Sequence, residues 1–196
     1  MIGVLSFQGS FAPHLRSLER LGAPAIPVKT LAELSKCDRL ILPGGESTVI
    51  SQHLEATGLG AEIQRRARAN ELGLFGTCAG AILLGREPAR AAGEAAPGGR
   101  QPVRLDLARV AVRRNAYGRQ IDSFRGGVTG LGALEGPLEG VFIRAPKLEP
   151  LSPDVEVLAR EGQDPVLVRD GRCLLGAFHP ELTEDLRVHR YFVEKV

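Results

Sequence analysis

Short apolar segments that end in glycine-containing turns alternate with helical segments through the first 85 residues of the chain. Apolar runs at 2–7, 38–42 and 72–76 each predict a buried strand. Leucines at positions 15, 18 and 21, followed by Gly22, predict an amphipathic helix with a glycine at its end. This alternation favours an α/β fold with a mainly parallel sheet, in which ligands bind at the carboxyl ends of the strands.

The remaining segments are expected to complete one domain spanning residues 1–196. Two prolines in segment 23–29 predict a strand at the sheet edge, and Ser47 or Thr48 is predicted to cap the following helix. Further strands are predicted at 104–112, 140–146, 155–160, 165–171 and 173–180, and a C-terminal helix is predicted after Thr183 as its N-cap. Residues 86–102 are rich in Gly, Ala, Pro and Arg, which predicts a surface loop.

Charge and cysteine content exclude several function classes. The chain has 25 basic and 23 acidic side chains, so its charge offers no reason to expect nucleic acid or an anionic membrane as a partner. No apolar run reaches the roughly 18 residues that span a bilayer, and no basic segment precedes the first apolar run as in a signal peptide. The cysteines at 37, 78 and 173 fit no disulfide framework or metal-ligand pair. We therefore expect a cytoplasmic protein without a metal site.

Cys78 lies in the sequence Gly76-Thr77-Cys78-Ala79-Gly80, between a predicted strand and a predicted helix. The pattern G-x-C-x-G is that of a nucleophile elbow with cysteine in place of serine. The glycines are needed because side chains there would collide with the neighbouring strand and helix. The helix N-terminus favours a thiolate, and the N–H of Ala79 is placed to stabilise an oxyanion.

A cysteine nucleophile needs a histidine base, and the chain has four histidines. His14, His53 and His189 lie in predicted helices, where surface or packing roles are expected. His179 instead follows the last apolar strand, at the same sheet edge as Cys78. Glu181 is two residues further on, and Pro180 is expected to hold both in an extended stretch where the carboxylate orients the imidazole. Cys37 and Cys173 lack flanking glycines and a nearby base, so structural roles are expected for them.

These motifs together resemble the class I (triad-type) glutamine amidotransferase family, in which G-x-C-x-G is combined with a later H-P-E and an upstream P-G-G. The resemblance covers essentially the whole chain, from the first strand IGVLSFQG onward, except for residues 86–102, which are longer and richer in Ala and Arg than expected. Five stretches narrow it to the branch that serves pyridoxal 5′-phosphate synthesis: LPGGEST (42–48), FGTCAGAILL (75–84), RRNAYGRQIDSF (113–124), GVFIRAP (140–146) and FHPELTED (178–185).

The resemblance implies a three-layer, flavodoxin-like sandwich that hydrolyses L-glutamine to L-glutamate and ammonia without a cofactor. It implies that Cys78 is the nucleophile, His179 the base and acid, and Glu181 its orienter. It further implies that Gly45, Glu46 and Ser47 hold the glutamine, that Gly45 and Ala79 donate to the oxyanion, and that Arg114, Ile143 and Arg144 bind the amino-acid end. From the residues alone, Arg114 is a surface arginine and Glu46 a helix-start carboxylate.

The resemblance also implies a partner, because this chain contains no synthase motif. The partner is a (β/α)₈ synthase subunit that joins the ammonia to a pentose phosphate and a triose phosphate. Two other functions remain open from the residues. One is a stand-alone amidase or peptidase on the same scaffold. The other is a regulatory module in which Cys78 is a redox sensor.

Overall fold

The computed structural model describes residues 1–89, 101–114 and 124–196. Within them, one nine-stranded sheet has the strand order β2-β1-β3-β4-β11-β10-β9-β6-β7. The first five of these strands pair in parallel: β2 (Ala25–Val28), β1 (Ile2–Leu5), β3 (Arg39–Leu42), β4 (Gly73–Thr77) and β11 (Cys173–Gly176). The prediction that the proline-containing segment forms an edge strand is confirmed by the position of β2.

The other four strands extend the sheet in antiparallel fashion: β10 (Asp164–Asp170), β9 (Glu156–Glu161), β6 (Phe124–Gly130) and β7 (Gly136–Phe142). A separate antiparallel pair consists of β5 (Val110–Arg113) and β8 (Lys147–Pro150). The parallel half forms the α/β core, and the antiparallel half packs beside it in the same sheet.

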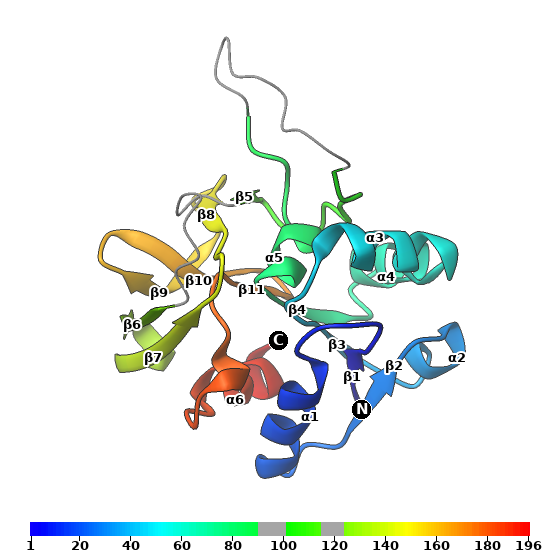
Figure 1. Ribbon diagram of the computed structural model, residues 1–196, viewed down its shortest axis with the longest axis horizontal. Coiled ribbons are helices and arrows are strands. Elements are labelled where there is room, and N and C mark those ends of the chain that lie inside the picture. Colours follow the sequence, from blue (N-terminus) through cyan, green and yellow to red (C-terminus); the bar gives the residue numbers. More distant parts are fainter. Residues whose placement is uncertain (90–100, 115–123) are drawn as a thin grey trace.

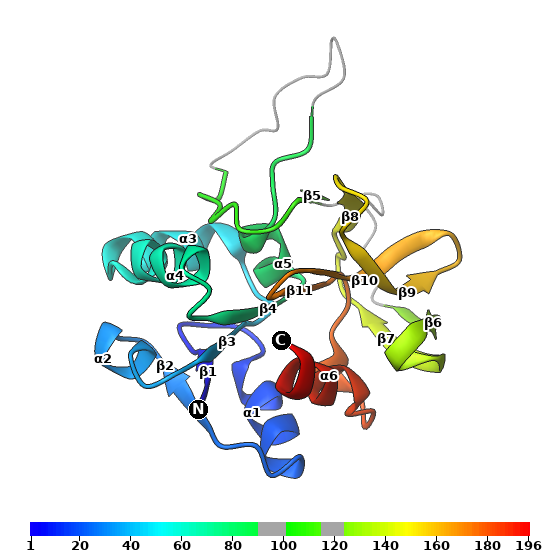
Figure 2. The same ribbon diagram turned by 180° about the vertical axis from the view of Figure 1, so that it is seen from behind.

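Helices cover both faces of the parallel strands, as Figures 1 and 2 show from opposite sides. On one face lie α3 (Ser47–Ala56), α4 (Leu59–Arg68) and α5 (Ala79–Leu84), and on the other lie α1 (Phe11–Arg20) and α6 (Arg187–Lys195). The short helix α2 (Leu31–Leu34) precedes β3. The α/β fold predicted from the alternating segments is confirmed, and so is the three-layer arrangement that the resemblance implies.

The order of the parallel strands decides where a site can form. Strand β4 lies between β3 and β11, and its last residue, Thr77, is in register with Gly176 at the end of β11. The residues that follow these strands therefore meet at one edge of the sheet. Strands β4 and β11 are buried along their whole length, which fixes this edge firmly to the core.

Several predicted element boundaries are wrong. The strands predicted at 140–146 and 173–180 end at Phe142 and Gly176, and three further differences have a local physical reason. Residues 104–109 are not a strand, because the N–H groups of Leu105 and Leu107 bond instead to the last carbonyls of α5. Helix α3 is capped by the Glu46 carboxylate, which accepts a bond from the N–H of Thr48. Helix α6 begins only at Arg187, because Thr183 uses its hydroxyl in the preceding turn, on the carbonyl of Pro180.

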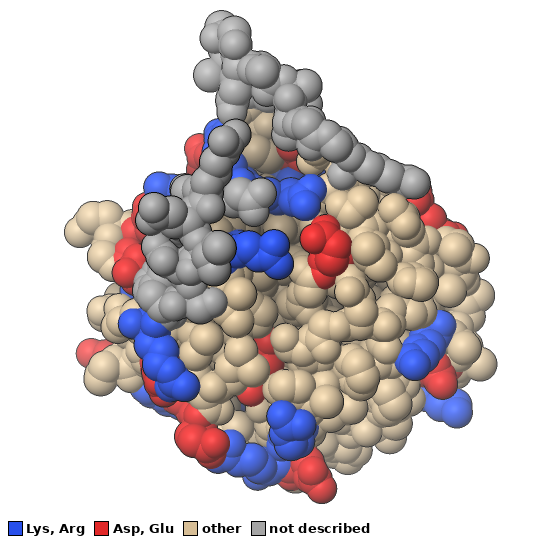
Figure 3. Space-filling view, viewed as in Figure 1, with Lys and Arg blue, Asp and Glu red and all other residues tan. Residues whose placement is uncertain are grey.

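Some predictions concern residues outside the described part of the chain. Residues 90–100 of the expected 86–102 loop and residues 115–123 are among them. On the face drawn in Figure 3, and away from its grey atoms, basic and acidic side chains are interspersed. No helix of the described residues is both long and apolar enough to cross a membrane.

Candidate active site

Cys78 stands at the junction of β4 and α5 in a backbone conformation that is rare for a residue with a side chain. Its φ is +49° and its ψ is −102°, a strained conformation of the kind found at functional sites. A Cβ on Gly76 would lie 2.5 Å from the carbonyl carbon of Gly80, and a Cβ on Gly80 would lie 1.9 Å from the carbonyl oxygen of Leu42 in β3. Both glycines are therefore required for the turn to fit against the helix and the strand, as the pattern predicts.

His179 follows β11 and is anchored on two sides. Its backbone N–H donates to the carbonyl of Val141 in β7 over 2.8 Å. Its ring Nδ1 lies 2.7 Å from Oε1 of Glu181. The expected extended stretch is wrong, because residues Pro180–Leu182 form a 3₁₀ turn, η2. The turn nevertheless brings the two side chains together, and both are almost fully buried.

The surroundings of His179 favour its charged form. Burial lowers the pKa of His179, but the Cys78 sulfur and the Glu181 carboxylate outweigh this and raise it to about 10. Burial likewise raises the pKa of Glu181, while His14 and His179 lower it, with a net lowering. At neutral pH the pair is thus an imidazolium held by a carboxylate, next to a sulfur atom.

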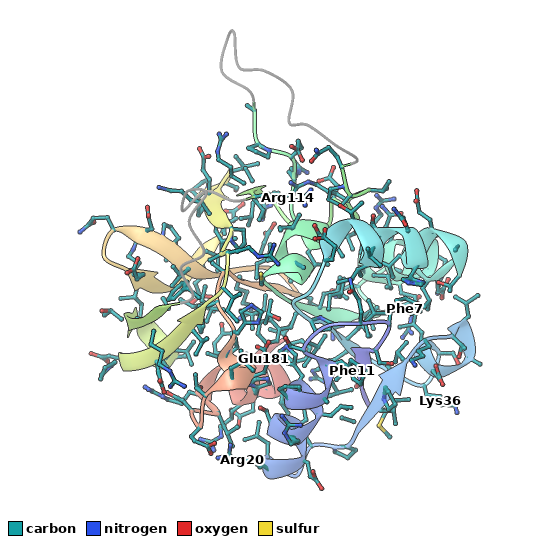
Figure 4. The ribbon with its side chains drawn as sticks, viewed as in Figure 1. Phe7, Phe11, Arg20, Lys36, Arg114 and Glu181 are labelled. Atoms are coloured by element: carbon teal, nitrogen blue, oxygen red, sulfur yellow. The ribbon has the colours of Figure 1, made fainter. Side chains whose placement is uncertain are left out.

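A cleft of about 380 Å³ opens above these residues. Its walls comprise Ser10, Gly45, Glu46, Ser47, Cys78, Ala79, Ile82, Arg114, Ile143, Arg144 and His179. The cleft therefore contains every residue predicted for the site except Glu181, which lies behind His179. In Figure 4, Arg114 is seen on the side of α5 and Glu181 on the side of α6.

The turn between β3 and α3 is held by two hydrogen bonds of the Gly44 backbone, at a place where no side chain would fit. The N–H of Gly44 donates to Oγ1 of Thr77 over 3.1 Å, and the carbonyl of Gly44 accepts from the N–H of Ser10 over 3.1 Å. A Cβ on Gly44 would lie 2.3 Å from Cε1 of His179. Among the described residues, 1–89, 101–114 and 124–196, the backbone N–H groups of Gly45 and Ala79 donate no hydrogen bond.

The outer wall of the cleft carries charges of both signs. Arg114 lies with Nη2 3.6 Å from Oε1 of Glu46, and its Nη1 donates to Gln101. The Glu46 carboxylate is half-exposed and also caps α3, so the simpler interpretation of this residue as a helix-start carboxylate is confirmed. A guanidinium and a carboxylate this close match the two charges of an amino acid.

The other end of the cleft is formed by the turn after β7. The carbonyl oxygen of Ile143 lies 3.7 Å from Sγ of Cys78, within reach of the S–H when the thiol is protonated. Arg144, which follows, has a φ of +46° and is exposed. This turn therefore brings one backbone acceptor and one cation to the rim of the cleft.

The other cysteines differ from Cys78 in their surroundings. All three cysteines are buried, but Cys37 and Cys173 do not line the cleft. Burial raises the pKa of both thiols, that of Cys173 to about 12. No cluster of side chains suited to a metal ion exists among the described residues. Cys78 is thus the cysteine that combines a cleft with a neighbouring histidine.

Sequence reasoning assigned His14 and His189 to packing and missed a polar role for Thr77. The structure brings these three together in a buried network behind His179 and Glu181. The available signal was the spacing of His14, Ser17 and Leu18, which places the histidine on the buried face of α1.

Comparisons with known proteins agree on one family. The model of the SNO glutamine amidotransferase family matches residues 4–196. A pyridoxal 5′-phosphate synthase subunit PdxT of Thermus thermophilus is 48% identical over 196 residues, 99% of this chain and 96% of that protein. The subunit of the same name from Mycolicibacterium vanbaalenii is 49% identical over 192 residues, 98% of this chain and 95% of that protein.

Solved structures show the same fold. A crystal structure described as a glutamine amidotransferase superposes with a TM-score of 0.87 at 46% identity, covering 98% of this chain and 97% of that one. The structure of PurLQS from Thermotoga maritima superposes with a TM-score of 0.67 at 18% identity, covering 98% of this chain and 96% of that one. The second likeness concerns the fold alone.

Proposed function

The chain belongs to the SNO glutamine amidotransferase family, and from this premise we propose that its cleft hydrolyses L-glutamine with Cys78, His179 and Glu181 as the catalytic triad. The chain is a glutaminase, and the ammonia it releases serves pyridoxal 5′-phosphate synthesis together with a synthase subunit. The observation that supports the triad most strongly is the shared cleft of Cys78 and His179, with Glu181 bonded behind the histidine.

In the first half of the reaction, the Cys78 thiolate adds to the side-chain amide carbon of glutamine. The carbonyl electron pair moves to the oxygen, where the N–H groups of Gly45 and Ala79 receive the negative charge. The intermediate then collapses and the C–N bond breaks. The His179 imidazolium gives its proton to the nitrogen, which leaves as ammonia, and a thioester remains on Cys78.

In the second half of the reaction, His179 acts as a base instead of an acid. Once the sulfur is acylated it carries no negative charge, and one contribution that raises the pKa of His179 is lost. The neutral imidazole takes a proton from water, the hydroxide adds to the thioester, and the C–S bond breaks. L-Glutamate leaves, and the thiolate and the imidazolium are restored.

The remaining residues of the cleft are assigned to binding the amino-acid end of glutamine. Arg114 pairs with the α-carboxylate and Glu46 with the α-ammonium, which accounts for two opposite charges 3.6 Å apart at the cleft wall. Ser47, Ile143 and Arg144 line the same cleft and complete the contacts with the substrate.

The partner is proposed to be a (β/α)₈ synthase subunit that docks around the mouth of the cleft. The 42–48 turn and the 113–120 segment are the proposed contact region, of which residues 115–120 lie outside the described part of the chain. Docking would rotate the Gly44–Gly45 peptide so that an N–H faces the substrate. Rotation has a definite cost, because it breaks the bond from the N–H of Ser10 to the carbonyl of Gly44.

The test is glutamine-dependent ammonia release, measured with and without the synthase subunit. We expect a rate that is low in the free chain and rises on titration with the partner by about 10²–10³-fold, the effect of one oxyanion donor. A high rate that the partner does not change would instead indicate a stand-alone amidase. No glutamine turnover in either case, with Cys78 oxidised reversibly, would indicate a redox module.

A further inference from the structure

Four elements that are distant in sequence meet behind the triad and bury a chain of polar groups. His14 on α1 has Nε2 3.4 Å from Oε2 of Glu181 and 3.2 Å from Oγ1 of Thr77. Its other ring nitrogen, Nδ1, lies 2.9 Å from Nε2 of His189 on α6. The His14 and His189 side chains are completely buried, beside the ring of Phe75.

This network touches both halves of the catalytic apparatus. Glu181 uses Oε1 for His179 and turns Oε2 toward His14. Thr77 accepts the N–H of Gly44 with the same hydroxyl oxygen that His14 contacts. One imidazole therefore lies between the orienting carboxylate of the triad and the turn whose next peptide is assigned to the oxyanion.

The positions of the ring protons on His14 and His189 follow from the one ring nitrogen that lacks a hydrogen-bond partner. Burial lowers the pKa of His14 and lowers that of His189 to about 3, so both rings are neutral. Nδ1 of His189 is buried without a partner among the described residues, and a bare lone pair there costs less than a bare N–H. His189 therefore donates from Nε2 to Nδ1 of His14, which places the His14 proton on Nε2, facing Glu181 and Thr77.

The titratable groups around this proton are few. Glu181 in the η2 turn and His179 directly before that turn face the Nε2 proton of His14, and His189 faces His14 from α6. Cys78 acts one step away, through His179. In this setting Nε2 of His14 lies 3.4 Å from Oε2 of Glu181, an oxygen that accepts no hydrogen bond of normal geometry from any described group. This polar contact limits where the Glu181 carboxylate can turn.

We propose that His14 is a positioning residue for glutamine hydrolysis, which holds the second oxygen of Glu181 and joins the triad to the Gly44 turn through Thr77. His14 does not line the cleft and does not touch the substrate. The proposal rests on the proposed function, because it assigns a role toward that same triad.

The decisive variants are two amides that differ by one methylene group. His14→Gln places an amide nitrogen near the position of Nε2 and keeps the donor toward Glu181. His14→Asn reaches only the position of Nδ1 and loses that donor. We expect kcat of the complex with the synthase subunit to fall by about 10- to 100-fold in His14→Asn, as for a lost polar contact with a buried charged group. His14→Gln should retain most of the activity, and KM for glutamine should change little in either variant.

A second readout separates positioning from a general loss of stability. The pH profile of Cys78 alkylation by iodoacetamide reports the thiolate beside His179. His14→Asn should move its midpoint to higher pH, because a less firmly held Glu181 stabilises the imidazolium, and with it the thiolate, less. His53→Asn, on an exposed position of α3, is the matched control and should leave both readouts unchanged.

The link to the Gly44 turn has its own pair of variants. Thr77→Val keeps the shape of the side chain but leaves the Gly44 N–H without its acceptor, so kcat should fall while the alkylation profile stays unchanged. Thr77→Ser should restore kcat. These two variants also decide the question if His14→Asn does not fold.

Two results would overturn the inference. One is His14→Asn with wild-type kcat and alkylation profile, and the other is Thr77→Val as active as Thr77→Ser. Failure of the proposed function looks different, because Cys78→Ala would then still hydrolyse glutamine in the complex.

Discussion

Nδ1 of His179 lies 2.7 Å from Oε1 of Glu181, although only Pro180 separates the two residues. The 3₁₀ turn η2 folds the segment back, so that the proposed base and its proposed orienter form one local unit. The unit is buried, and its imidazole reaches the cleft from the carboxyl end of β11.

Removing the charge of the orienter should disable the base. Glu181→Gln removes interactions that raise the pKa of His179, so that pKa should fall from about 10 toward its ordinary value. The amide also no longer enforces the correct tautomer, a defect that costs roughly 10⁴ in kcat in the Ser–His–Asp case. Turnover with the synthase subunit and an NMR titration of His179 measure the two effects.

If Glu181→Gln keeps near-normal turnover, another carboxylate must orient His179. Glu184 is the nearest alternative in sequence, but it pairs with Arg20 over 2.8 Å and is almost fully exposed. Glu184→Gln is therefore the matched control and should keep full activity.

A glutamine-like electrophile should label Cys78 and spare the other cysteines. Burial raises the pKa of Cys37 and Cys173, and neither lines the cleft. We expect mass spectrometry after limited reaction to find the label on Cys78 alone. Equal labelling of the three residues would refute the assignment of the elbow.

Cys78→Ala should separate the two activities of the complex. Glutamine-driven synthesis should be lost, and synthesis from added ammonium salt should continue, because the partner's chemistry does not use this cysteine. Both rates are measured by the formation of pyridoxal 5′-phosphate. Loss of both would mean that Cys78 is needed to hold the subunits together.

Arg114→Ala should raise KM for glutamine by about 10- to 100-fold, since a charge-assisted contact with the α-carboxylate is lost. Alkylation of Cys78 by a small neutral reagent should keep its rate, because that reagent does not use the arginine. Arg125→Ala, on an exposed position of β6, is the control for a change in net charge. An unchanged KM would place the amino-acid end of glutamine elsewhere.

Gly9→Ala should disturb the oxyanion turn from outside the cleft. A Cβ on Gly9 would lie 1.9 Å from the carbonyl oxygen of Gly44, and Gly9 has a φ of +85°. Because this carbonyl oxygen bonds to Ser10 in the resting orientation of the Gly44–Gly45 peptide, the variant should disfavour that orientation. We expect glutamine turnover of the free chain to rise toward that of the complex, by up to about 10²–10³-fold, the effect of one oxyanion donor. Gly22→Ala is the matched control, because Gly22 also has a positive φ of +66° but no atom within 4 Å of its Cβ. If both variants change the activity of the free chain equally, backbone strain and not the turn is responsible.

The parallel half of the sheet and the elbow could be predicted because local patterns specify them. Gly76 and Gly80 flank Cys78 at positions where a Cβ would come within 2.5 Å of a backbone atom, so their spacing is a steric signature. His179 could be located because it follows an apolar strand at the same edge.

The antiparallel extension was predicted less completely. Strand β6 contains three glycines and β8 has only four residues, so neither shows the alternation of a half-buried strand. The contact of His14 with Glu181 was also missed. It depends on groups brought together by tertiary packing, which no local pattern records.

The place of β11 in the sheet has a consequence for how the chain is made. Strand β11 lies between β4 and β10, yet it follows β4 by about one hundred residues and is the last strand to be synthesised. Until it emerges, β4 and β10 each present an unpaired edge to the surroundings. A nascent chain stalled before Cys173 therefore holds two open half-sheets, and the addition of β11 joins this aggregation-prone intermediate into one continuous sheet.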